Sequence, residues 1–227
     1  MSRITPISLS LAVPIALMSQ AALADLTPND VWGDWQQYMQ GMGYTIDATE
    51  TQNGADLTVG EIRMGMDIPD DGGSMAMTLG TIEFKQNNDG TVSIILPDIM
   101  PMTMQIAPKE PQTETVTISM NYTQADHSMT ASGSPDEMTY DYAAGTIGLS
   151  LEELQVGAET FGAENAKVNV IGSGVSSSTT MSIADMRGYQ QMGKIDNLQY
   201  DVAINNPTEP AKITMSGSVA DVTMQGG

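Results

Sequence analysis

The sequence predicts an all-β protein: a long, bent antiparallel sheet, open or half-barrel in form, with one N-terminal amphipathic helix packed on it. Two observations carry this prediction. After residue 56, apolar and polar residues alternate in run after run, which is typical of antiparallel strands with one face in a core and one in water. Before residue 42, a single segment instead repeats its apolar residues with helical spacing.

The first 24 residues have the order of a secretory signal peptide. One basic residue, Arg3, precedes an apolar run over 4–18, and the small-residue triplet Ala22-Leu23-Ala24 follows, as a cleavage site does. The apolar run is too short for a membrane span, which needs about 20 apolar residues. We therefore expect cleavage of residues 1–24, and a periplasmic or secreted mature chain that does not span a membrane.

The mature chain, residues 25–227, is expected to form a single β-rich domain. It ends directly after an alternating run, so a second expectation is that it is the N-terminal part of a longer domain. It carries all 28 acidic residues of a chain whose net charge is −20. Such a surface repels phosphate backbones, so no nucleic-acid partner is expected. Cysteine is absent, and stability must come from the core rather than from disulfides.

The helix is predicted over residues 28–40. Thr27 can cap its N-terminus, and Gly41 is a natural stop at its end. Trp32 and Trp35 are expected to be structural residues that pack against the sheet. The apolar face consists of Val31, Trp32, Trp35, Tyr38 and Met39.

Two shifts in the alternation predict where strands bend. The apolar phase of Leu57 and Val59 changes at Gly60-Glu61, as at a β-bulge, and a similar shift falls at Gly80. Further alternating runs cover 92–96, 102–106, 116–122, 138–142, 147–151, 168–170, 198–204, 213–215 and 222–224. Turn residues at 70–73 and 87–90 predict hairpin loops.

Two further features are less regular. Ile183, Met186 and Tyr189 are spaced by three, which predicts a second, weaker helix over 183–192. A short repeat relates residues 130–139 to 214–223. It indicates either chance reuse of a Gly-Ser kink or a duplicated meander.

The residues available for catalysis are few. His127 is the single histidine, and the absence of cysteine excludes Cys-His nucleophiles. The motifs G-x-S-x-G and S-x-x-K are both absent. We expect His127 to be an exposed turn residue and the chain not to be an enzyme. Adjacent acids at 70–71, 136–137 and 152–153 are expected to be solvated, and the loops at 67–78 and 85–96 lack a calcium ligand set.

Methionine is unusually common, with 19 residues, and several are separated by one residue. Thioether clusters suit Cu(I), but the same spacing arises on a strand with one buried face. We expect core packing, with no cofactor and no metal. The alternative is a Cu(I) site at Met100, Met102 and Met104.

Two segments resemble a known family. Residues 24–35, Ala-Asp-Leu-Thr-Pro-Asn-Asp-Val-Trp-Gly-Asp-Trp, resemble the secreted alphaproteobacterial proteins called domain of unknown function 2125. Residues 129–142, Met-Thr-Ala-Ser-Gly-Ser-Pro-Asp-Glu-Met-Thr-Tyr-Asp-Tyr, are similar to that family too. The resemblance implies a β-rich envelope protein. The family has no accepted activity, so no functional residue follows from it.

The expected function comes from the shape of the sheet. A bent sheet has an inner apolar face that one helix cannot fully cover. We therefore expect a non-enzymatic periplasmic protein whose apolar groove binds a lipid or other hydrophobic ligand, or an envelope protein. The alternatives are a methionine-based Cu(I)-binding protein and a purely structural envelope component.

Overall fold

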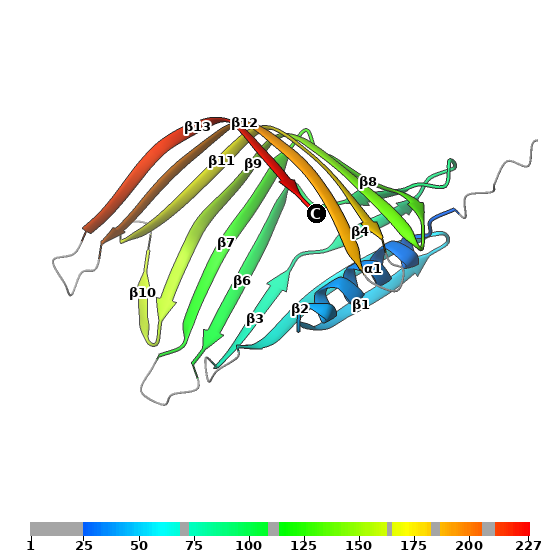
Figure 1. Cartoon of the computed structure of the whole chain (residues 1–227). Helices are drawn as coiled ribbons and strands as arrows, with labels where there is room; N and C mark the ends of the chain where they lie inside the picture. The colour runs from blue at the N-terminus through cyan, green and yellow to red at the C-terminus, as the bar shows by residue number, and fades with distance from the viewer. Residues whose placement is uncertain (1–24, 69–72, 109–113, 163–164, 183–186, 206–211) are drawn as a thin grey trace, which may run out of the picture.

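The computed structural model describes residues 25–68, 73–108, 114–162, 165–182, 187–205 and 212–227. It confirms an all-β protein with one helix: the strands form a single antiparallel sheet that arches over helix α1 (Pro28–Gly41) (Figure 1). The strands are β1 (Thr45–Asn53), β2 (Asp56–Ile68), β3 (Gly73–Leu79), β4 (Ile82–Gln86), β5 (Val92–Ile95), β6 (Ile99–Ala107), β7 (Val116–Ala125), β8 (Ser128–Ser134), β9 (Glu137–Val156), β10 (Glu159–Phe161), β11 (Ala166–Ser182), β12 (Gly188–Asn205) and β13 (Lys212–Gly226). Among the described residues, the one helix is neither long nor apolar enough to cross a membrane.

The helix begins as the sequence predicts. The Thr27 hydroxyl accepts a hydrogen bond from the Asp30 amide at 3.2 Å, and the Asp30 carboxylate accepts one from the Thr27 amide at 2.9 Å. This reciprocal pair satisfies two amides that a helix start leaves free. At the other end, Gly43 has a φ of +93°, which turns the chain into β1.

The sheet is an up-and-down meander of long rows. β3 and β4 pair with β2 in one register, with Leu79 opposite Ile62 and Ile82 opposite Val59. β3 and β4 therefore lie end to end along β2. In the same way, β7 and β8 lie end to end along β9. Between them, β6 pairs with β3 and β7, and β5 pairs with β4 and β8. The order is β1, β2, β3–β4, β5–β6, β7–β8, β9, β11, β12 and β13, with β10 paired to the end of β9.

A line of bends crosses the sheet and produces the arch. Asp126, Gly174 and Asp221 have φ values of +51°, +60° and +52°. The strand registers place Gly174 between Gly145 and Asp196, and Asp196 opposite Asp221. These residues form what we call the bend row. Glycine and aspartate tolerate the left-handed conformation that the bends require. A Cβ at Gly174 would also meet the Asp196 side chain, which would have to move.

The bulge predicted at Gly60-Glu61 is confirmed. Glu61 has a φ of +52°, and the register between β1 and β2 shifts between Asp47 and Thr49. The Thr49 hydroxyl donates to the Glu61 carboxylate at 2.8 Å, which holds the bulge in place. The shift at Gly80 falls where β3 ends and β4 begins, so it marks a break between two strands rather than a bend within one.

The prediction of a second helix over 183–192 is wrong for the residues that the structure describes. Residues 183–186 lie outside the described residues. Tyr189 belongs to β12. β12 pairs with β11 on one side and β13 on the other, so its backbone groups are bonded along both edges. These ladders outweigh the helical spacing of three apolar residues.

The duplicated meander is also wrong. In the first copy Gly133, with a φ of +107°, lies at the hairpin between β8 and β9. In the second copy Gly217 lies inside β13, opposite Tyr200, with no turn. The two copies therefore have different structures.

The core lies between α1 and one half of the arch. Phe84 is fully buried there, with its ring centroid 6.1 Å from that of Trp32 and 5.5 Å from that of Trp35. Trp32 is buried and its indole nitrogen donates to the Glu50 carboxylate at 2.6 Å. Trp35 is half-buried and also contacts Tyr140. Both tryptophans of α1 therefore pack against the sheet.

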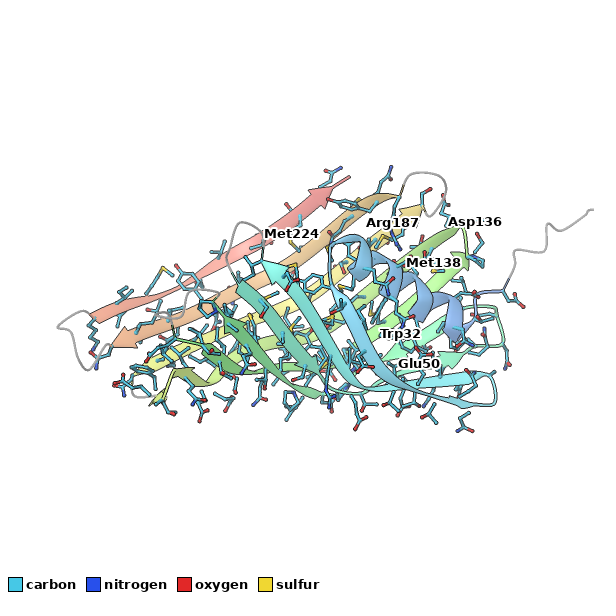
Figure 2. The ribbon with its side chains drawn as sticks, turned by 90° about the horizontal axis from the view of Figure 1, so that it is seen from below. Trp32, Glu50, Asp136, Met138, Arg187 and Met224 are labelled. Carbon is cyan, nitrogen blue, oxygen red and sulfur yellow. The ribbon has the colours of Figure 1, made fainter. Side chains whose placement is uncertain are left out.

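A buried ion pair holds the helix from its other flank. The Arg187 guanidinium contacts the Asp34 carboxylate, which is almost completely buried. The Tyr140 hydroxyl donates to the same carboxylate at 2.7 Å, and Arg187 lies 5.3 Å from the Tyr38 ring centroid. Figure 2 shows the helix between Arg187 on one flank and Glu50 on the other.

Candidate functional site

The side of the sheet that faces α1 carries a continuous apolar surface, here called the inner face. Side chains that lie directly opposite one another across strands share a face. One such cross-strand row consists of Met64, Met77, Met104, Ile118 and Leu154. A second row consists of Met100, Tyr122, Leu149, Val170 and Tyr200. The inner face thus extends from β2 to β12 without a charged residue in either row.

The helix covers only one half of this face. α1 packs on β1, β2 and β4, on one side of the bend row. We call the other side the open half. There the inner apolar residues of β6, β7 and β11 are only partly buried. Toward the β13 edge they are exposed: Ile213 is 61% and Met215 is 55% accessible. A contiguous apolar surface that the fold leaves uncovered often marks a binding site.

A small cavity continues the inner face beneath the helix. Its volume is about 100 Å³, and its walls are entirely apolar, including Trp35, Met39, Met64 and Leu79. The inner face is therefore an open, arched surface that leads into a small apolar cavity, rather than a deep pocket.

One polar cluster interrupts the inner face, next to the bend row. The Tyr142 hydroxyl donates to the Gln124 side-chain carbonyl at 3.0 Å, and the hydroxyls of Tyr122 and Tyr142 are 3.0 Å apart. The Gln124 amide donates to the carbonyl of Pro97 at 3.2 Å, and Gln124 is 3% exposed. Burial raises the pKa of the Tyr142 phenol, so this group is neutral at physiological pH.

The sequence analysis did not single out this cluster. The sequence does contain a signal for it. Gln124 is a polar residue at the next inward-facing position after the alternating run over 116–122. A polar residue in a buried phase must find partners. The two tyrosines supply them here.

The methionines come together on the inner face. Met64 lies opposite Met77, Met66 opposite Met75, and Met77 opposite Met104, so three methionine pairs occupy adjacent strands. Met100, Met102 and Met104 all point inward from β6, and Met102 faces Met120 of β7. Within the described ranges, no group of three or more histidine, aspartate or glutamate side chains could hold a metal ion.

The expectation of an exposed His127 is wrong. It lies at the bend between β7 and β8, and its side chain is only 14% exposed. Its Nε2 is 3.1 Å from the Leu96 carbonyl oxygen, and its Nδ1 is 3.7 Å from the Asp98 carboxylate. The imidazole therefore links the β5–β6 connection to the bend.

The loop at residues 87–90 is a hairpin turn, as predicted. The Asn87 amide donates to the Thr91 carbonyl at 2.9 Å, and the Asp89 carboxylate accepts from the Thr91 hydroxyl at 2.7 Å. The hydrogen bonds that the Thr91 hydroxyl and the Thr91 amide donate to the Asp89 carboxylate lower the pKa of Asp89. The paired acids at 70–71 lie outside the described residues.

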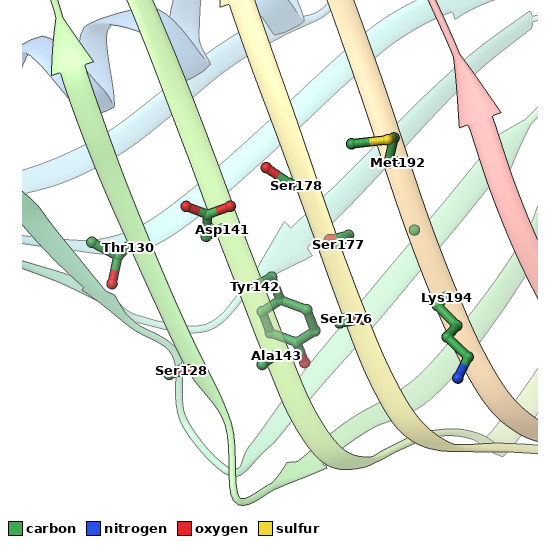
Figure 3. A pocket seen from close by; sticks show the side chains of 11 residues that line it. Ser128, Thr130, Asp141, Tyr142, Ala143, Ser176, Ser177, Ser178, Met192 and Lys194 are labelled. Carbon is green, nitrogen blue, oxygen red and sulfur yellow. The ribbon is translucent and has the colours of Figure 1, made fainter.

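The outer face of the sheet has the larger hollows, and hydroxyl-bearing side chains contribute to their walls. One of about 480 Å³ lies over β8, β9, β11 and β12, with α1 behind the sheet (Figure 3). Ser176, Ser178 and Thr130 contribute hydroxyls to it, and its lysine, Lys194, is paired with Asp196 at 2.7 Å. A solvated, hydroxyl-rich surface is the ordinary outer side of an antiparallel sheet, so the inner face is the stronger candidate site.

The fold and the inner face define a class: an arched all-β protein whose helix covers one half of an apolar surface and leaves the other half open. No protein-family model, no curated protein and no solved structure matches this chain.

Proposed function

We propose that this protein is a non-enzymatic binding protein that works in the periplasm or outside the cell and holds a hydrophobic ligand on its inner face. The observation that carries the proposal is the continuous apolar surface of the open half, which no described element covers. Burial of apolar surface is worth about 25 cal/mol per Å², so an apolar ligand that covers this surface would bind favourably. The signal-peptide pattern and the resemblance to secreted envelope proteins support the location.

Two adjacent residues of β11 allow a matched test of this proposal. Val170 points to the inner face, opposite Leu149 and Tyr200, whereas Ile171 points to the outer face and is 38% exposed. We expect the wild-type protein to bind the uncharged probe Nile red. Val170→Gln should weaken this binding about tenfold, because loss of a buried valine contact costs about 1.5 kcal/mol.

The control variant is Ile171→Gln, which should bind Nile red as the wild type does. Circular dichroism would show that both variants fold. Equal losses in the two variants would contradict the inner face as the binding surface. Failure of the wild type to bind the probe would support a purely structural role instead.

A second candidate function is Cu(I) binding, and the clustering of methionines on adjacent strands favours it. The test replaces Met100, Met102 and Met104 by leucine, which keeps apolar volume and removes the thioethers. On the hydrophobic-ligand proposal, the wild type forms no stoichiometric Cu(I) complex in competition with a chromogenic chelator, and the triple variant binds Nile red unchanged.

The control for this test is Met192→Leu, at an outer-face methionine that is 65% exposed. A stoichiometric Cu(I) complex that survives Met192→Leu and is lost in the triple variant would favour the copper-binding function over the hydrophobic-ligand proposal.

A further inference from the structure

We infer that the polar cluster of Tyr122, Gln124 and Tyr142 is the subsite for the head of the ligand, and that this head is an uncharged group bearing a hydroxyl. The inference rests on the proposed function, because it assigns the orientation and class of a ligand on the inner face.

The hydrogen bonds of the cluster leave one acceptor free. Tyr142 donates to the Gln124 carbonyl at 3.0 Å, and Tyr122 donates either to the Tyr142 oxygen, 3.0 Å away, or to the same carbonyl, 3.5 Å away. Both hydroxyl hydrogens are then used inside the cluster. Among the described residues, nothing donates to the Tyr122 oxygen. A ligand group that reaches this oxygen must therefore donate a hydrogen bond, as an alcohol does.

The charge of the site disfavours an ionised head. The cluster contains no cation, Gln124 is almost fully buried, and burial raises the pKa of the Tyr142 phenol. Transfer of an unpaired ion into such surroundings is costly. The net charge of −20 adds long-range repulsion against anions in particular.

The position of the cluster suits a head with a long apolar chain. Tyr122 lies beside the bend row, and β7 continues from it to Val116 through Met120 and Ile118, all on the inner face. Six residues of strand span roughly 20 Å at a rise of about 3.3 Å. A head at Tyr122 would place the alkyl chain along the open half.

The test compares three ligands with similar alkyl chains: 1-dodecanol, dodecyl methyl ether and laurate, each as a competitor of Nile red. Dodecanol can donate a hydrogen bond, the ether can only accept, and laurate is an anion. We expect the wild type to prefer dodecanol over the ether about fivefold, which corresponds to one neutral hydrogen bond. Laurate should compete least.

Two tyrosine variants locate the effect. Tyr122→Phe should remove the preference for dodecanol over the ether while binding of the ether stays the same. Tyr200→Phe is the matched control, because Tyr200 belongs to the same cross-strand row but not to the cluster, and it should keep the preference.

The outcomes separate the two proposals. If neither Nile red nor any of the three ligands binds, the proposed function fails. If all three ligands bind equally, or if Tyr122→Phe keeps the preference for dodecanol, the hydrophobic surface stands and the head subsite is wrong.

Discussion

Replacement of Phe84 by alanine is expected to lower the free energy of unfolding by about 3–5 kcal/mol. The ring is completely buried and lies against both tryptophans of α1, at 6.1 Å and 5.5 Å between centroids. Its removal opens a cavity where the helix meets β4, and the helix cannot move to fill it while Arg187 and Glu50 hold its flanks. Urea denaturation followed by tryptophan fluorescence measures this loss directly.

The chain offers a matched control, because Phe161 is the other phenylalanine. It lies half-buried in the short strand β10, away from the helix. Phe161→Ala should cost less than half as much as Phe84→Ala. Equal losses would show that the helix–sheet core is not the main source of stability.

The second large effect is expected from Asp34→Ala, which should cost about 3 kcal/mol. The substitution leaves the Arg187 guanidinium and the Tyr140 hydroxyl without their shared partner. Removal of one member of a buried pair typically costs about 3–5 kcal/mol. The lower end applies here, because the Arg187 side chain is 26% exposed and retains some contact with water.

A double variant tests whether the loss comes from the unpaired charge. Arg187→Met in the Asp34→Ala background should recover part of the stability, because the guanidinium no longer lacks a counterion. Lys167→Ala removes one member of an exposed pair with Asp201 and should change stability little. If the double variant is less stable than Asp34→Ala alone, Arg187 stabilises the helix mainly through its contact with the Tyr38 ring and its hydrogen bond to the Asp34 backbone carbonyl.

The sequence was most informative about the helix and about which residues share a face. The cap at Thr27 and the spacing of Trp32 and Trp35 are local signals, and the structure confirms both. The inner phase of each run is also local, because side chains alternate along any strand. The bulge at Glu61 could be predicted for the same reason, since a shift of phase needs an extra residue or a bend.

The sequence was least informative about how the runs join. The runs over 138–142 and 147–151 are two halves of β9, bent at Gly145, whereas the shift at Gly80 separates β3 from β4. A phase shift looks the same in the sequence whether a strand bends or ends. Only the pairing with a neighbouring strand, which depends on distant residues, distinguishes the two cases.

The candidate site shows the same division. The sequence by itself determined that most strands of this chain have one apolar face, that its surface is acidic and that a well-capped helix lies near its N-terminus, because these depend on residue types and local spacing. Only the tertiary structure decided that Tyr122 and Gln124 meet Tyr142, that Asp34 meets Arg187, and that the methionine pairs lie side by side. Those contacts join residues far apart in the chain, and the strand register that creates them follows from the arch of the whole sheet.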